Sequence, residues 1–278
     1  MTFVKYLSGN KPQIIKREAL VQIRNGVLPG ASEKYTEILH DLDDKIRAVV
    51  PSVTVSALSN CHGDWYEWFL AIAAWNLAAS NPNLNIAILL PNKTALDLAS
   101  LYEQNLYDKV IDLRKKVEDS STVQLISSNP DFIILKRQLA NEAFGPITPI
   151  TSLNKLDIEK LNGAYKALSG RCSFDDIIGY LSVKTSFRPD RRLQISHEGS
   201  LMKAIYVHLQ TREWIINPLG LKYFAMATVV GKPDRASLKT VATHSITTVS
   251  STPEPAVDEV FQVNDTHSAN IAFRTILR

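Results

Sequence analysis

One segment of the chain is so apolar around its circumference that, as a helix, it must be largely buried. This helix is expected to begin near Asp64, and its large apolar residues are Trp65, Trp68, Phe69, Ile72 and Trp75. Such a helix needs packing partners on nearly every side. We therefore expect it to brace the core of the protein.

The composition is that of a globular protein with a substantial core. Hydrophobic residues make up 45% of the 278 residues and charged residues 21%, and nothing separates two halves of the chain. We expect one main domain over residues 1–278, with an N-terminal helical subregion at about residues 1–60. The formal net charge of +3 favours an anionic partner only slightly, because many proteins without such ligands carry the same balance.

Two features indicate a cytoplasmic location. The two cysteines, Cys61 and Cys172, are isolated thiols without CxxC spacing, which suits a reducing compartment better than a disulfide framework. No apolar run reaches the roughly 18 to 20 residues needed to cross a bilayer, and the first residues lack the apolar stretch of a signal peptide. We expect no association with a membrane.

Periodicity and turn signals give the expected elements. Apolar residues at helical spacing predict further helices at residues 35–49, 94–118, 155–169, 193–212 and, after a proline, 256–261. Short apolar runs predict strands at residues 85–90, 123–127, 132–135, 177–185, 223–230 and 245–249. Residues 136–152 look irregular, residues 188–192 look like a loop, and a tail follows the last helix. Strands and helices mix without a strict βαβ repeat, so we predict an α/β fold with a mixed central β-sheet flanked by helices.

Three charged residues are placed where phosphodiester chemistry could use them. Asp131 starts a strand directly after Pro130, and Lys184 lies late in another strand, so both can project from one edge of the sheet. Glu198 lies about one turn into the helix that follows. Two carboxylates suit Mg²⁺, which keeps several waters, and a lysine can stabilise charge on an attacked phosphate.

Each residue also has an ordinary structural explanation. An Asp after a proline at a turn is common, and a Glu on an amphipathic helix is usually solvated. A lysine between Leu181, Val183 and other apolar strand residues is less ordinary, since an ammonium resists burial. Taken alone, these residues leave both explanations open.

Longer motifs connect the chain to a known group of enzymes. Asn129-Pro130-Asp131, Ser182-Val183-Lys184, the segment RPDRRLQISHEGSLMK and Thr243-His244-Ser245 resemble, in this order, the type II restriction endonucleases that recognise a CCGG core. These enzymes belong to the PD-(D/E)XK nuclease superfamily. The resemblance runs from about residue 61 to residue 261. It implies a restriction-endonuclease-like fold and Mg²⁺-dependent hydrolysis of double-stranded DNA at a palindromic CCGG-core site, leaving 5′-phosphate ends and a CCGG 5′ overhang.

The usual superfamily motif is broken in this chain. Ser182 stands where the motif places an acid two residues before Lys184, and the resemblance implies that Glu198 on the next helix replaces that acid. The implied metal ligands are Asp131, Glu198 and Glu67, and the implied catalytic residues are Asp131, Lys184, Glu198, Glu67 and Ser182. For Glu67 an alternative stays open, because Asp64 and Glu67 have the spacing of a capping box at a helix start.

The segment after Lys184 offers base recognition. Arg forms bidentate bonds to guanine and a carboxylate accepts from cytosine, so Arg188, Asp190 and Arg191 fit a G·C target. A two-fold dimer would repeat the reading to give CCGG. The alternative is a solvated turn with an Asp–Arg ion pair. For the four tryptophans, including Trp214, core packing is a better explanation than stacking on bases.

The expected partners are double-stranded DNA and further copies of the chain. The resemblance implies a homodimer at least, with tetramers in some relatives, and a cognate DNA methyltransferase in the same system without direct contact. One alternative is a sequence-specific DNA-binding protein without catalysis, which would bind CCGG but leave it uncut. Another is a structure-specific repair nuclease, whose cleavage would not depend on CCGG.

Overall fold

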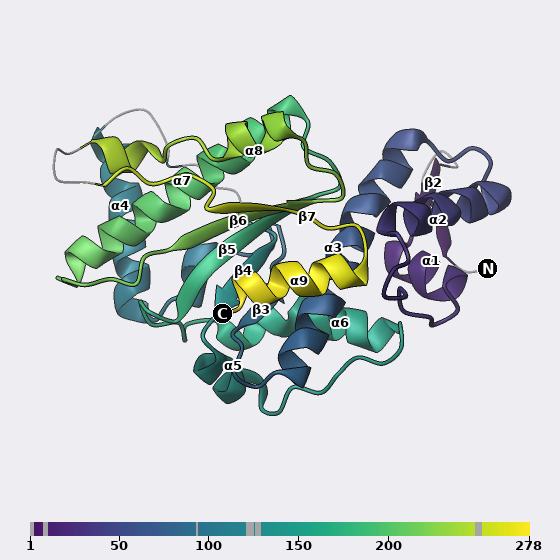
Figure 1. Cartoon of the computed structure of the whole chain (residues 1–278), viewed down its shortest axis with the longest axis horizontal. Helices are drawn as coiled ribbons and strands as arrows, with labels where there is room; N and C mark the ends of the chain where they lie inside the picture. The colour runs from purple at the N-terminus through teal and green to yellow at the C-terminus, as the bar shows by residue number, and fades with distance from the viewer. Residues whose placement is uncertain (1–2, 8–10, 93, 121–124, 126–128, 248–251) are drawn as a thin grey trace.

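A five-stranded mixed sheet forms the centre of the protein. The computed structural model describes all residues except 1–2, 8–10, 93, 121–124, 126–128 and 248–251 (Figure 1). In sheet order the strands are β3 (Ile86–Leu89), β4 (Phe132–Leu135), β5 (Ile177–Lys184), β6 (Lys222–Ala227) and β7 (Glu259–Gln262). The pairs β3–β4 and β4–β5 are antiparallel, whereas β5, β6 and β7 run parallel to one another. The predicted fold class is thus confirmed.

Helices cover both faces of this sheet. Helix α7 (Pro189–Arg212) and helix α8 (Lys232–Leu238) lie above it in Figure 1, while α9 (Thr266–Ile276) and the second half of α3 (Val55–Ser80) lie below it. Phe132 on β4 packs against Phe273 of α9, with ring centroids 6.3 Å apart. Three further helices surround this assembly: α4 (Gln104–Ser120), α5 (Arg137–Phe144) and α6 (Lys155–Gly163).

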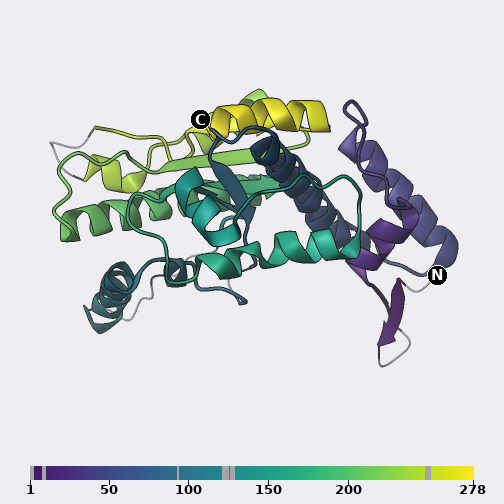
Figure 2. The ribbon, with the colours of Figure 1, turned by 90° about the horizontal axis from the view of Figure 1, so that it is seen from below.

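The first sixty residues gather beside the end of the sheet, at the right of Figure 1. They form a hairpin of β1 (Val4–Leu7) and β2 (Lys11–Ile14), then α1 (Lys16–Ile23) and α2 (Tyr35–Val49). Helix α2 has the predicted bounds, but the hairpin, which projects from the body in Figure 2, was not expected in a helical subregion. No helix among the described residues is long and apolar enough to cross a membrane.

Helix α3 is buried as predicted but begins earlier. The side chain of Thr54 accepts a hydrogen bond from the amide of Ala57 at 3.2 Å and caps the helix, which starts at Val55 instead of near Asp64. Within it Trp65 and Trp75 are fully buried. The prediction for Trp214 was wrong, because this side chain is 89% exposed, close to exposed Ile216 and Leu219.

Several other boundaries differ from the prediction. The region 136–152 contains α5, residues 256–261 hold strand β7 instead of a helix, and the expected tail contains α9. The expected strand at 245–249 is in its described part the 3-10 helix η3 (Thr243–Ile246), and the strand at 123–127 lies outside the described residues except Leu125. The predicted helix at residues 94–118 contains η1 (Leu98–Leu101) before α4, and the predicted helix at residues 155–169 contains η2 (Ala164–Leu168) after α6. Partners distant in sequence determine the secondary structure of such segments. Strand β7, for example, forms because it pairs in parallel with β6.

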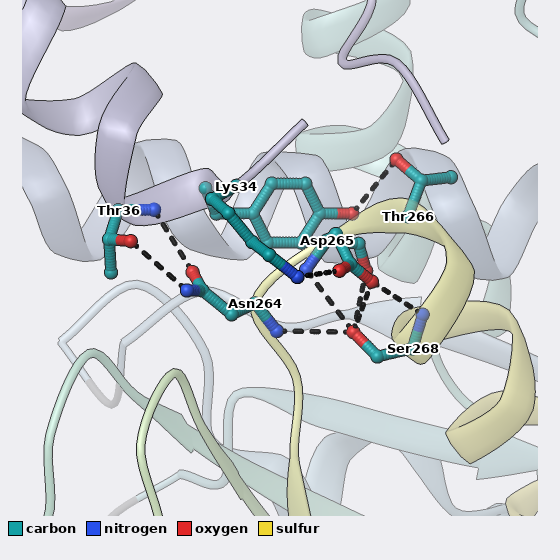
Figure 3. Close-up of polar contacts among 7 residues, drawn as sticks. Lys34, Thr36, Asn264, Asp265, Thr266 and Ser268 are labelled. Carbon is teal, nitrogen blue, oxygen red and sulfur yellow. Dashed lines mark hydrogen bonds and ion pairs between the residues drawn. The ribbon is translucent and has the colours of Figure 1, made fainter. Parts of the chain in front are cut away.

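A polar cluster joins the start of α2 to the start of α9 (Figure 3). Lys34 forms an ion pair with Asp265, and the Thr36 amide donates to the side chain of Asn264 at 3.0 Å. Asp265 also caps α9 by accepting from the Ser268 amide at 2.7 Å. Burial alone would raise the pKa of Asp265, but hydrogen bonds from Lys34 and Ser268 outweigh it and lower the pKa to about 2.

Asp265→Asn removes the charge but keeps a side chain that can cap the helix. A carboxylate with a lowered pKa stabilises the fold above the usual Asp pKa near 4, and this stability is lost as the pH falls toward 2. We expect the variant to lose about 2 kcal/mol of unfolding free energy at pH 7 and about half as much at pH 3, measured by urea denaturation.

Asp41→Asn is the control, since Asp41 forms an exposed ion pair with Lys45 and its loss should cost less than about 0.5 kcal/mol. Equal losses in the two variants would contradict a special role for the cluster around Asp265.

Candidate active site

The carboxylate of Asp131 is held by the end of strand β5. Asp131 directly precedes β4, whose antiparallel register pairs Phe132 with Leu181 and so sets Asp131 beside the last residues of β5. Its Oδ2 accepts hydrogen bonds from Lys184 Nζ at 2.8 Å, from Ser182 Oγ at 3.3 Å and from the backbone amide of Val183. The two residues predicted from the strand ends therefore form an ion pair.

Glu198 reaches the same region from α7 and is buried instead of solvated. Its side chain is 4% exposed, and Oε2 accepts a hydrogen bond from the Tyr223 hydroxyl at 2.6 Å. Because α7 begins at Pro189, Glu198 lies deeper in this helix than the expected single turn.

A glycine lets α7 approach the sheet closely at this point. A Cβ on Gly199 would lie 2.3 Å from the carbonyl oxygen of Ala256 and 3.0 Å from the ring of Tyr223. Real side chains never approach a backbone atom so closely. The absence of a side chain at Gly199 thus sets how near the neighbouring Glu198 comes to β6.

Glu67 enters the site from α3, and the capping explanation for it is wrong. Helix α3 is capped by Thr54, well before Glu67, and Asp64 forms an ion pair with Lys16 at 2.6 Å. Burial and then the negative charge of Asp131 raise the pKa of Glu67 well above its usual value, against the opposing charge of Lys184.

Lys184 is the cation that balances these acids. Burial is the strongest single influence and lowers the pKa of Lys184, but Asp131, Glu67 and Glu198 together outweigh it and raise the pKa above the ordinary lysine value. The side chain therefore stays an ammonium ion at neutral pH.

Two adjoining hollows open onto this cluster. The first, of about 580 Å³, is lined among others by Lys184, Arg188 and Arg191, and the second, of about 490 Å³, by Asp131 and Lys184. Glu67 lines both. Asp131, Glu67 and Lys184 thus stand at the boundary of two open spaces at the C-terminal end of strand β5, a usual place for a site in an α/β sheet.

The carboxylates fit a lightly held Mg²⁺ better than a closed protein cage. In the part of the chain that the structure describes, no group of three or more His, Cys, Asp or Glu residues is arranged to hold a metal ion. Mg²⁺ usually keeps several waters and takes only one or two carboxylates from the protein. Of the three predicted acids, Glu67 lines both hollows and Asp131 the second, whereas Glu198 is not among the residues that line either.

The RPDRR segment is the first turn of α7 and not the predicted loop. Arg188 is the residue before the helix and Pro189 its first residue, where a missing amide hydrogen is harmless. Asp190 lies between Arg188 Nη2 at 3.0 Å and Arg191 Nε at 3.8 Å. All three side chains are well exposed and close to the first hollow, so they are both ion-paired and accessible.

Sequence reasoning missed Tyr223, which touches Glu198. It stands at the start of the predicted strand 223–230 and looks there like any apolar strand residue. Its contact with Glu198 depends on how α7 packs on β6, which no local pattern reveals.

Comparison with known proteins decides the family. The model described as "Cfr10I/Bse634I restriction endonuclease" matches residues 4–278. The chain belongs to this family. It is 40% identical over 263 residues to the type II restriction enzyme Cfr10I of Citrobacter freundii, covering 92% of each chain.

Two solved structures of Bse634I extend the likeness to three dimensions. The restriction endonuclease Bse634I matches with a TM-score of 0.89 and 30% identity, and its complex with cognate DNA, described as a type IIF enzyme, with a TM-score of 0.90 and 30% identity. Each match covers 100% of this chain and 98% of the other. The resemblance found in the sequence is confirmed, and the chain is a type II restriction endonuclease, a site-specific deoxyribonuclease of the Cfr10I/Bse634I family. This favours the nuclease over both a non-catalytic DNA-binding protein and a structure-specific repair enzyme.

The two glycines inside long helices should respond oppositely to alanine. Gly199→Ala forces a Cβ against the Ala256 carbonyl and should cost about 1 to 3 kcal/mol of unfolding free energy. Gly63→Ala meets nothing within 4 Å in α3 and should gain about 0.5 to 1 kcal/mol from helix propensity. Urea denaturation of both variants measures the difference, and a stabilised Gly199→Ala would show that α7 does not pack so closely.

Proposed function

We propose that this chain cleaves double-stranded DNA at palindromic sites with a CCGG core, in a reaction that depends on Mg²⁺ and leaves 5′-phosphate ends and a CCGG 5′ overhang. The observation that carries the proposal is the Asp131–Lys184 ion pair at the end of β5, with Glu198 buried beside it from α7. The family of the chain and the printed description of its relative Bse634I, solved with cognate DNA, support the same activity.

The proposed roles follow from charge and position. Asp131 and Glu198, with Glu67 close by, would hold Mg²⁺, which when bound supplies positive charge on the phosphate and lowers the pKa of a water. Lys184, whose pKa the surrounding acids raise, stabilises negative charge on the attacked phosphate. Ser182 stands in the usual acid position and donates to Asp131, which steadies that carboxylate.

Base recognition is assigned to the start of α7. Arg188, Asp190 and Arg191 project beside the hollow that Lys184 lines, so bases read by them lie close to the scissile phosphate. Two arginines and one carboxylate suit two successive G·C pairs in the major groove. The ion pairs with Asp190 would hold both guanidinium groups in place before DNA arrives.

We further propose that the chain acts in the cytoplasm as one catalytic and DNA-recognition unit, and at least as a homodimer. A palindromic site presents the same bases twice, and a two-fold dimer offers two active sites to the two strands. Exposed Trp214, Ile216 and Leu219 form an apolar surface that assembly could bury. An enzyme of this activity also requires a DNA methyltransferase that protects the host sequence.

Lys184→Ala should strongly slow cleavage. Loss of a cation on the attacked phosphate should slow cleavage of a CCGG duplex in Mg²⁺ by about 100- to 1,000-fold or more, measured by gel electrophoresis under single-turnover conditions. The control Lys45→Ala removes an exposed lysine of α2 and should cleave as the natural protein does. Retained cleavage in Lys184→Ala would contradict the assigned site.

Arg191→Ala should weaken discrimination more than binding. Without Mg²⁺, the ratio of the dissociation constants for a CTAG and a CCGG duplex should fall by about 10- to 100-fold, because one bidentate contact to guanine is lost. Arg274→Ala on α9 removes the same charge and should leave this ratio unchanged. A uniform loss of affinity in Arg191→Ala would assign this side chain to a phosphate instead of a base.

A further inference from the structure

Tyr223 links the buried glutamate of α7 to strand β6. Its hydroxyl donates to Glu198 Oε2 at 2.6 Å. The tyrosine is fully buried on β6. A single phenol on β6 thus fixes one oxygen of the acid that α7 supplies.

The surroundings keep this phenol a donor. Burial and then the negative charge of Glu198 raise the pKa of Tyr223 well above that of a free tyrosine. A hydrogen bond from a neutral donor to a carboxylate is one of the stronger kinds in proteins.

The backbone of Tyr223 is fixed as firmly as its ring. Its amide donates to Asp258 Oδ2 at 2.8 Å, and its carbonyl accepts from the Asp258 amide at 2.7 Å. Asp258 in turn forms an ion pair at 2.8 Å with Lys203, a lysine only 2% exposed that also donates to the carbonyl of Pro255. On the other side, the ring packs on the helix at Gly199.

We propose that Tyr223 is a positioning residue for metal binding, which holds the Glu198 carboxylate in the orientation needed to act with Asp131. The inference rests on the proposed function and adds a residue to it. Glu198 lies on a helix, so its side chain must extend toward the sheet to reach the site. A glutamate side chain is flexible, and it keeps a single orientation only if a partner holds it. Partners of this kind around metal ligands typically change metal affinity or activity by about 10- to 100-fold when removed.

The test compares Tyr223→Phe with Tyr35→Phe. Both tyrosines are fully buried and each variant removes one hydroxyl, but the Tyr35 hydroxyl bonds to Thr266, away from the site. Mn²⁺ binding to the protein, measured by isothermal titration calorimetry, should weaken about 10- to 100-fold in Tyr223→Phe only. The Mg²⁺ concentration for half-maximal cleavage should rise in parallel, while CCGG binding without metal stays unchanged.

The outcomes separate the two proposals. If the natural protein binds Mn²⁺ and cuts DNA while Tyr223→Phe matches Tyr35→Phe in Mn²⁺ affinity, the positioning role is overturned. If the natural protein neither binds Mn²⁺ nor cuts, the proposed function itself fails. Should Tyr223→Phe not fold, Asp258→Ala removes the side-chain acceptor of the Tyr223 amide and should lower Mn²⁺ affinity in the same direction. An unchanged affinity in a folded Asp258→Ala also overturns the role.

Discussion

The antiparallel pairing of β4 with β5 is the constraint on which the site depends. It places Asp131, which directly precedes β4, beside the last residues of β5. There a backbone amide, a serine and a lysine all donate to one carboxylate oxygen of Asp131. The remaining parts are arranged around this contact. Helix α3 brings Glu67 to it, and helix α7 brings Glu198 from the other face of the sheet.

The charge balance of the cluster supports the proposed Mg²⁺. Three carboxylates face one lysine, so the site has more negative than positive charge in a partly dehydrated space. Burying uncompensated charge is costly, and a bound divalent ion relieves that cost. Burial, and then the negative charge of Asp131, raise the pKa of Glu67 in the same cluster.

The sequence predicts the positions of those candidate residues that neighbours along the chain fix. Asp131 and Lys184 follow from strand ends, and RPDRRLQISHEG follows from a motif. Glu67 was ambiguous, because D-x-x-E spacing describes a capping box as well as an acid, and only the start of α3 at Val55 resolves this. Tyr223 escaped entirely, since its role arises from packing between α7 and β6. In the fold, helix α2 and strand β4 were predicted with their observed bounds, whereas β7 and α9 depend on partners that lie far away in sequence.

The most direct test of the central claim is the position of the metal in a complex with DNA. Crystals of the protein with a CCGG duplex and Mn²⁺ would locate the ion by anomalous X-ray diffraction. We expect Mn²⁺ to contact the carboxylates of Asp131 and Glu198, with Lys184 at the scissile phosphate and the start of α7 in the major groove. An ion bound elsewhere, or a duplex that does not cover the two hollows, would contradict the assignment of the active site.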